Sequence, residues 1–157
     1  MRSFLLRDNS PIIKWGLLPD GTMYQGKIPD GYDLAINPHH PYIIIDVDRH
    51  GKKDGFLSIP EHLKAELEST FHYPTKHNGM HYWFYYSGDK SLSNKASKLG
   101  IDLRTGNQKF SKTEWTHGGY VKWHPRDTIN IMNVLHKVNK SSPKLNDWIE
   151  SLFAYTK

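Results

Sequence analysis

Two aspartates separated by one residue end a run of β-branched side chains, Tyr-Ile-Ile-Ile-Asp-Val-Asp, at positions 42–48. The run predicts a buried strand, and residues two apart on a strand share a face, so Asp46 and Asp48 point the same way. Neighbouring carboxylates repel each other, and a divalent cation such as Mg²⁺ or Mn²⁺ removes that conflict. The alternative is a strand that ends in a solvated acidic loop, and the pair alone does not decide between the two.

A third aspartate, Asp102, lies in the segment Gly-Ile-Asp-Leu-Arg-Thr-Gly at positions 100–106. This segment is a short strand candidate that ends at a glycine turn, so Arg104 shares the face of Asp102. A metal-bridging carboxylate beside a cationic side chain suits a site for a nucleoside triphosphate. The alternative is a simple surface ion pair, which contributes little to stability.

The segment Thr-Lys-His-Asn-Gly-Met-His at positions 75–81 contains an Asn-Gly pair, which predicts a tight turn. His81 then begins the strand that leaves the turn, and together with Lys76 it can donate hydrogen bonds to phosphate oxygens. The alternative is a structural or merely exposed histidine. The ten histidines show no spacing typical of zinc ligands and the chain has no cysteine, so no zinc site is expected.

Taken in order, four segments of the chain resemble the bifunctional primase-polymerase (prim-pol) domain of the archaeo-eukaryotic primase superfamily, which is common in phages and plasmids. They lie at 42–48, 75–84, 100–104 and 118–125, and the resemblance spans roughly residues 27–125. It implies that Asp46 and Asp48 match the family's first metal-binding motif and that Asp102 matches the third. It also implies that His81 is the nucleotide-binding histidine of the second motif.

The chain departs from the family pattern at two places. The family usually has Ser-Gly-Gly before the histidine, where this chain has His-Asn-Gly at 77–79. The closing Pro-Pro-Ser of the family is replaced by His-Pro-Arg at 124–126. Both departures concern the binding of the triphosphate rather than the three aspartates.

The resemblance implies template-directed nucleotidyl transfer, in which a 3′-hydroxyl attacks the α-phosphate of a triphosphate and pyrophosphate is released. Two Mg²⁺ or Mn²⁺ ions on the three aspartates would serve this chemistry, and His81, Lys76 and Arg104 would hold the triphosphate. The implied partners are a DNA template and primer, nucleoside triphosphates and a separate helicase or replication protein. Two other functions stay open: a metal-dependent nuclease, and a catalytically inactive module that binds nucleic acid or protein.

The charge of the chain favours a polyanionic partner. Its formal net charge is +5 and its pI about 9.3, and between positions 76 and 126 nine Lys and Arg stand against three acidic residues. The alternative is a solvated basic face. Tyr82, Phe84 and Tyr86 are expected in the core, whereas base stacking and core packing are both open for the tryptophan that follows Tyr82. The residues expected to line a nucleic-acid groove are Trp83, Lys95, Lys98, Lys122 and Arg126.

The elements that must position these residues alternate strands with helices, which predicts an α+β fold. Strands are expected at 11–18, 42–47, 81–86, 100–104 and 119–123. A helix is expected over 58–70, where Ser58 and Glu61 match a capping box and the apolar positions 63, 67 and 71 fall on one face. Two C-terminal helices are expected, one from apolar residues at every third position of 129–138 and one opening at Ser142-Pro143. The resemblance implies an RRM-like mixed or antiparallel sheet with packed helices.

A chain of 157 residues without a repeat or a Gly/Ser linker is expected to form a single domain. Its core would cover about 24–127 and its helical tail about 128–157. The absence of cysteine excludes disulfides and thiolate catalysis and fits a reducing compartment. No secretory signal and no apolar stretch of membrane-spanning length is visible, so a cytoplasmic location in a bacterial or phage-infected cell is expected, with no membrane partner.

Overall fold

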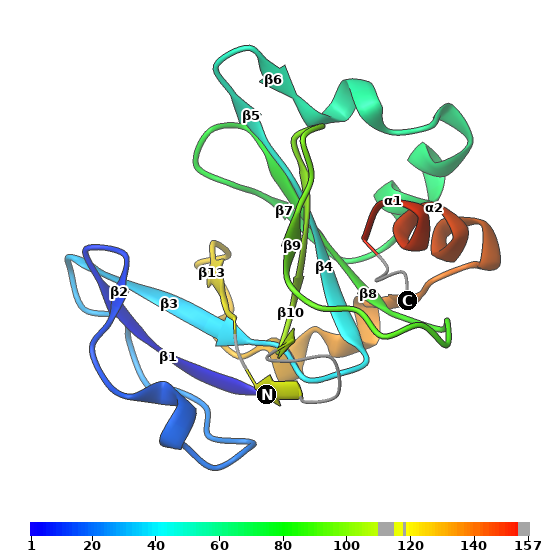
Figure 1. The fold of residues 1–157 in the computed structure, drawn as a ribbon. Coiled ribbons are helices and arrows are strands. Elements are labelled where there is room, and N and C mark those ends of the chain that lie inside the picture. Colours follow the sequence, from blue (N-terminus) through cyan, green and yellow to red (C-terminus); the bar gives the residue numbers. More distant parts are fainter. Residues whose placement is uncertain (110–114, 118, 154–157) are drawn as a thin grey trace.

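The β-branched run at 42–47 forms the strand around which the fold is arranged. In this computed structural model, which describes residues 1–109, 115–117 and 119–153, β4 (Tyr42–Val47) lies inside the largest sheet (Figure 1). It pairs in antiparallel register with β8 (Met80–Tyr85) on one side and with β10 (Ile101–Thr105) on the other. The three strands predicted at 42–47, 81–86 and 100–104 are therefore confirmed.

Short strands complete the edges of this central sheet. β9 (Lys95–Ala96) pairs with the outer edge of β10. β7 (His72–Pro74) and β14 (Asn139–Lys140) occupy successive stretches of the outer edge of β8, the first antiparallel and the second parallel. The chain immediately before the second C-terminal helix is thus part of the sheet, because β14 belongs to it.

A second antiparallel sheet is built largely from the N-terminal residues, and β1 (Arg2–Arg7) and β3 (Tyr32–Asn37) pair in it over their full length. Neither of these strands was predicted. The strand predicted at 119–123 is confirmed as a shorter β13 (Val121–Trp123), which pairs with β3. The strand predicted at 11–18 is wrong, because only Pro11 pairs with β1 and Trp15–Leu17 form a 3₁₀ turn. The order of the sheet is β13 (Val121–Trp123), β3 (Tyr32–Asn37), β1 (Arg2–Arg7), β2 (Ser10–Pro11).

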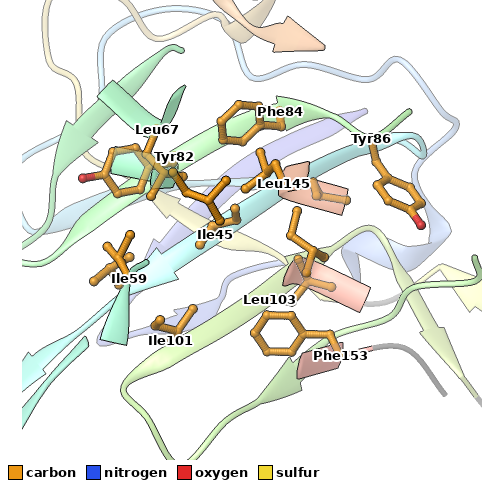
Figure 2. Close-up of a cluster of buried hydrophobic side chains, with 14 of the residues drawn as sticks. Ile45, Ile59, Leu67, Tyr82, Phe84, Tyr86, Ile101, Leu103, Leu145 and Phe153 are labelled. Carbon is orange, nitrogen blue, oxygen red and sulfur yellow. The ribbon is translucent and has the colours of Figure 1, made fainter. Parts of the chain in front are cut away.

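Two helices cover one face of the central sheet. α1 (Lys64–Ser69) and α2 (Pro143–Phe153) pack against the side chains of β4, β8 and β10 that alternate onto this face (Figure 2). The amphipathic spacing predicted after Ser142-Pro143 is confirmed by the burial of three apolar side chains of α2. In the ranges that the structure describes, no helix is long and apolar enough to cross a membrane. The fully buried side chains of this core include Ile45, Phe84, Leu103, Leu145, Ile149 and Phe153.

The opposite face of the central sheet packs against the N-terminal sheet. Ile44 and Trp83 from the central sheet meet Leu34, Ile36 and Trp123 from the second sheet, and none of these side chains is exposed by more than 1%. The result is three layers, with helices on one side of the central sheet and the N-terminal sheet on the other (Figure 1). The predicted α+β class is confirmed.

The helix predicted over 58–70 is much shorter. Gly55–Ser58 and Glu61–Leu63 form separate 3₁₀ turns, and the α-helix begins only at Lys64. The predicted capping box is absent, because the hydroxyl of Ser58 donates to the carbonyl of Leu99 at 3.5 Å. The extended backbone at Ile59 and Pro60 separates the turns, and this is why the chain cannot continue as one helix.

The first of the two predicted C-terminal helices is also wrong. Residues 129–138 contain two 3₁₀ turns, Ile131–Asn133 and Leu135–Lys137, instead of an α-helix. The predicted apolar face is also wrong, because Met132 is 56% exposed and the buried side chains are those of Ile131 and Val134. Lys137 then accepts a backbone hydrogen bond from Phe71, which commits the chain to the sheet.

Truncation of Leu103 tests whether β10 is held by the core beneath it. Leu103 is fully buried, so Leu103→Ala is expected to lower the free energy of unfolding by about 2–5 kcal/mol. Leu57 is 85% exposed and provides a matched control, since Leu57→Ala should stay within about 0.5 kcal/mol of the wild type. Urea unfolding measures both, and equal effects would contradict the packing described for β10.

Candidate functional site

The three aspartates lie on two neighbouring strands. The register of β4 and β10 places Asp102 directly opposite Asp46, and Asp48 follows on the same face. One carboxylate oxygen of each residue lies within 4.8 Å of the corresponding oxygens of the other two. The convergence expected from the sequence is therefore confirmed.

The backbone after β4 is held against the turn that begins β10. The amide of Asp48 donates to the carbonyl of Gly100 at 2.8 Å, and the amide of Gly55 donates to the carbonyl of Asp48 at 2.9 Å. A Cβ at Gly55 would lie 2.2 Å from the Gly100 oxygen, so no other residue fits this approach without a shift. These contacts fix Asp48 although it lies beyond the end of β4.

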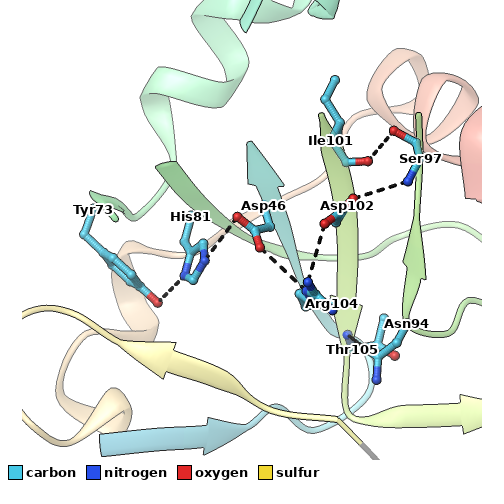
Figure 3. A network of polar contacts seen from close by, with 9 residues as sticks. All are labelled: Asp46, Tyr73, His81, Asn94, Ser97, Ile101, Asp102, Arg104 and Thr105. Atoms are coloured by element: carbon cyan, nitrogen blue, oxygen red, sulfur yellow. Dashed lines mark hydrogen bonds and ion pairs between the residues drawn. The ribbon is translucent and has the colours of Figure 1, made fainter. Parts of the chain in front are cut away.

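Arg104 lies between two of the carboxylates (Figure 3). Its Nε is 3.6 Å from Oδ2 of Asp46, and its terminal nitrogen is 3.4 Å from Oδ2 of Asp102. The other oxygen of Asp102 accepts the amide of Ser97 at 3.2 Å. Asp48 forms no ion pair with any residue of the described ranges. The face shared by Asp102 and Arg104 is confirmed, but only part of the negative charge is balanced.

His81 is buried and has a partner at each ring nitrogen (Figure 3). Its Nε2 lies 3.3 Å from Oδ1 of Asp46, which is ion-pair distance, and its Nδ1 lies 3.2 Å from the hydroxyl of Tyr73. The indole of Trp83 donates to the same hydroxyl at 3.1 Å. Since an indole N–H only donates, the Tyr73 proton is available to Nδ1, which favours a proton on Nε2 facing Asp46. Donation from His81 to a triphosphate stays a prediction.

Crowding changes the proton affinities of the site. Burial, together with the charges of Asp46 and Asp102, raises the pKa of Asp48 to about 6. Burial also opposes ionisation of Asp46, but nearby His81 and Arg104 outweigh it and lower the pKa of that carboxyl. Of these two carboxyl groups, Asp48 is therefore the one whose ionisation the crowding disfavours.

The geometry fits a hard divalent cation. Oδ1 of Asp46 is buried, and His81 Nε2, although it lies at ion-pair distance, is not aligned for a hydrogen bond to it in the described part of the chain. Coordination to a cation would satisfy this oxygen, and all three donors are carboxylates. Among the residues that the structure describes, no other group of three acidic or histidine side chains lies close enough to hold an ion. The three aspartates can hold a metal ion.

The aspartates face a cavity of about 1080 Å³ whose lining comes from both sheets. It is large enough for a nucleotide-sized ligand. Lys95, Lys98 and Arg126 do not line it, and Arg126 pairs with Asp33 at 3.4 Å. The other predicted site residues that line it are Lys76, His81, Arg104 and Lys122.

Trp83 contradicts the prediction that it stacks on nucleic acid. It shares the face of His81, as the strand alternation predicted, but it is fully buried between the two sheets. Its ring meets that of Trp123 edge-on, with centroids 6.0 Å apart. A base cannot reach a side chain without exposed surface, so core packing is confirmed for Trp83, as it is for Tyr82, Phe84 and Tyr86.

The sequence predictions missed the basic side chains on the rim of the cavity. β5 (Arg49–His50) and β6 (Lys53–Asp54) form a hairpin directly after Asp48, and Arg49, His50, Lys52 and Lys53 all line the cavity. A signal was present in the Arg-His-Gly-Lys-Lys run at 49–53. Such a run looks like a solvated loop, and only the fold shows that it lies beside the aspartates.

Comparison with known proteins assigns this chain to no family. No match to this chain was found among protein-family models or among curated proteins. The resemblance to the prim-pol domain stays a prediction that rests on the segments quoted above. The chemistry of the site has to be inferred from its geometry.

The raised pKa of Asp48 predicts a pH-dependent gain in stability when its charge is removed. Because the folded value of about 6 lies above the ordinary 3.8, ionisation of Asp48 costs stability as the pH rises from 4 to 6, and the cost persists above 6. Without divalent ions, Asp48→Asn is expected to raise the melting temperature at pH 8 and to change it little at pH 4. Asp89→Asn, at an exposed position, is the matched control.

Divalent ions should reverse the order of the melting temperatures of the wild type and Asp48→Asn. Mg²⁺ or Mn²⁺ at pH 8 should raise the melting temperature of the wild type more than that of Asp48→Asn, because a ligand stabilises the state that binds it. Thermal unfolding with and without the ion measures this. A metal-free Asp48→Asn protein that melts below the wild type at pH 8 would show that the carboxylates do not repel each other as described.

Proposed function

We propose that this chain is a metal-dependent nucleotidyltransferase of the primase-polymerase kind, which joins nucleotides on a DNA template and releases pyrophosphate. The observation that carries the proposal is the convergence of three aspartates in a cavity whose rim is basic. Acidic groups beside basic groups suit an anionic ligand that reaches the carboxylates through divalent cations. A nucleoside triphosphate is such a ligand.

The three aspartates would hold Mg²⁺ or Mn²⁺, with two ions expected for this chemistry. When bound, the ions stabilise the charge that develops on the attacking and leaving oxygens. Arg104 keeps Asp46 and Asp102 aligned, and Lys76 stands on the rim where it can meet phosphate oxygens. The 3′-hydroxyl oxygen would give up its proton to solvent and bond to the α-phosphorus, as the bond from that phosphorus to the oxygen of the departing pyrophosphate breaks.

The electrostatics of Asp48 support a ligand site over a purely structural ion-pair network. A network that exists for stability would neutralise this carboxylate, yet Asp48 has no ion pair in the described ranges and its pKa is raised to about 6. Perturbed carboxyls in a cavity are typical of functional sites. A nuclease would use the same aspartates, and its independence of triphosphates distinguishes it from the proposed enzyme.

The arrangement of the sheets supports a more specific proposal than the α+β class, namely an RRM-like primase core. β4, β8 and β10 form its antiparallel centre, with α1 and α2 on the face opposite the aspartates. The DNA template and primer would approach the other wall of the cavity, where Tyr120 and Lys122 stand. A separate helicase or replication protein would supply the unwound template.

Removal of single carboxylates tests the proposal directly. With a primed DNA template, labelled deoxynucleoside triphosphates and Mn²⁺, the wild type is expected to extend the primer. Asp46→Asn and Asp102→Asn should each reduce incorporation by about a hundredfold or more, because each removes charge that holds the ions. Asp89→Asn, outside the cavity, should retain wild-type incorporation.

The same assay separates the alternatives. Shortening of the primer without triphosphates, abolished by Asp102→Asn, would identify a nuclease instead. Melting curves of each variant show whether a loss of incorporation reflects unfolding. No incorporation by a well-folded wild type with either ion and either sugar would contradict the proposal.

A further inference from the structure

The β5–β6 hairpin brings basic side chains to the end of the strand that carries the aspartates. Gly51 makes its turn with φ +62°. Arg49 is held in place, since its Nε lies 3.4 Å from Asp54 and its guanidinium lies 4.4 Å from the ring centre of Phe56. Lys52 is exposed at the tip and forms no ion pair with any described residue. The hairpin is therefore anchored at its base and carries unpaired charge at its tip.

A second loop meets this hairpin on the rim. The turn between β7 and β8 is closed by a hydrogen bond from the amide of Thr75 to the carbonyl of Gly79 at 3.0 Å. A Cβ at Gly79 would lie 2.4 Å from the carbonyl oxygen of Val47, so this loop packs closely on the end of β4. The rings of His50 and His77 are 6.3 Å apart. Both loops thus approach each other beside the aspartates.

We propose that the hairpin and the loop together clamp the β- and γ-phosphates of a triphosphate whose α-phosphate lies at the aspartates. This phosphate clamp rests on the proposed function and specifies where the terminal phosphates of its substrate bind. Basic side chains at this end of the cavity would compensate the charge of the terminal phosphates, which a carboxylate-rich site otherwise repels. Its members are Arg49, His50, Lys52, Lys53, Lys76 and His77, all of which line the cavity.

The distribution of unpaired charge favours a polyphosphate over a nucleic-acid strand at the clamp. On the opposite wall, Lys122 already interacts with Asn9 at 2.7 Å and with Asp33 at 3.5 Å. Lys52, Lys53 and Lys76 have no such partner within the described ranges. The basic side chains without an ion-pair partner in the described ranges thus gather beside the aspartates, where a short phosphate chain would lie.

Binding of inorganic tripolyphosphate to the full chain tests the clamp. In the presence of Mg²⁺, Lys52→Gln/Lys53→Gln is expected to bind tripolyphosphate at least about tenfold more weakly than the wild type, by calorimetry. Lys137→Gln/Lys140→Gln removes the same charge at two exposed positions outside the cavity and should leave binding unchanged. Melting curves confirm that both double variants are folded.

Several results would overturn the clamp. One is that the wild type does not bind tripolyphosphate, and another is that the two double variants lose equal affinity for it. A third is that the hairpin variant loses affinity for single-stranded DNA but still binds tripolyphosphate as the wild type does. Primer extension on the same proteins separates this from the proposed function. A wild type that extends primers, with an unchanged KM for triphosphates in the hairpin variant, refutes the clamp alone. Hairpin-dependent tripolyphosphate binding without any incorporation refutes the nucleotidyltransferase alone.

Discussion

The repulsion among three carboxylates on one sheet face is the constraint to which the rest of the structure responds. The register of β4 and β10 places Asp46 and Asp102 opposite each other, and like charges in opposed positions of a sheet destabilise it. The sheet tolerates this because the alternate side chains of the same strands, such as Ile45 and Leu103, are fully buried under α1 and α2. The hydrophobic face therefore fixes the register that the acidic face opposes.

A linear chain of hydrogen bonds and ion pairs holds Asp46 and Asp102 in place. It runs from Trp83 through Tyr73 and His81 to Asp46, and from there through Arg104 to Asp102. Each member has its geometry set by the next, which is the support that a metal ligand requires to stay in position. Asp48 lies outside this chain, and burial together with the charges of Asp46 and Asp102 raises its pKa to about 6. Natural sequences accept such local conflicts chiefly at functional sites.

The sequence predicted the acidic face well because that face depends on the two-residue period of a strand. The period correctly put Asp46 and Asp48 together, and Asp102 with Arg104. Contacts distant in sequence were harder to anticipate. β1 and β3 pair across the intervening segment 8–31, and at 129–138 the buried side chains, Ile131 and Val134, are not those of the predicted helical face. The hairpin at 49–54 showed only charge, and its position over the cavity follows from the anchoring of Asp48 and Gly55.

Trp83 shows most clearly why an aromatic residue cannot be assigned to a ligand from its strand face alone. It shares the face of His81, but the N-terminal sheet covers that face up to the point where the cavity begins. Trp83 contacts Trp123, and Trp123 also stacks on Phe71 with ring centres 5.7 Å apart. These rings lie between the two sheets and hold them apart. His81 and His124, whose rings are 5.7 Å apart, line the cavity where this aromatic core ends. The aromatic residues of this segment thus pack in the core, while charged side chains line the cavity.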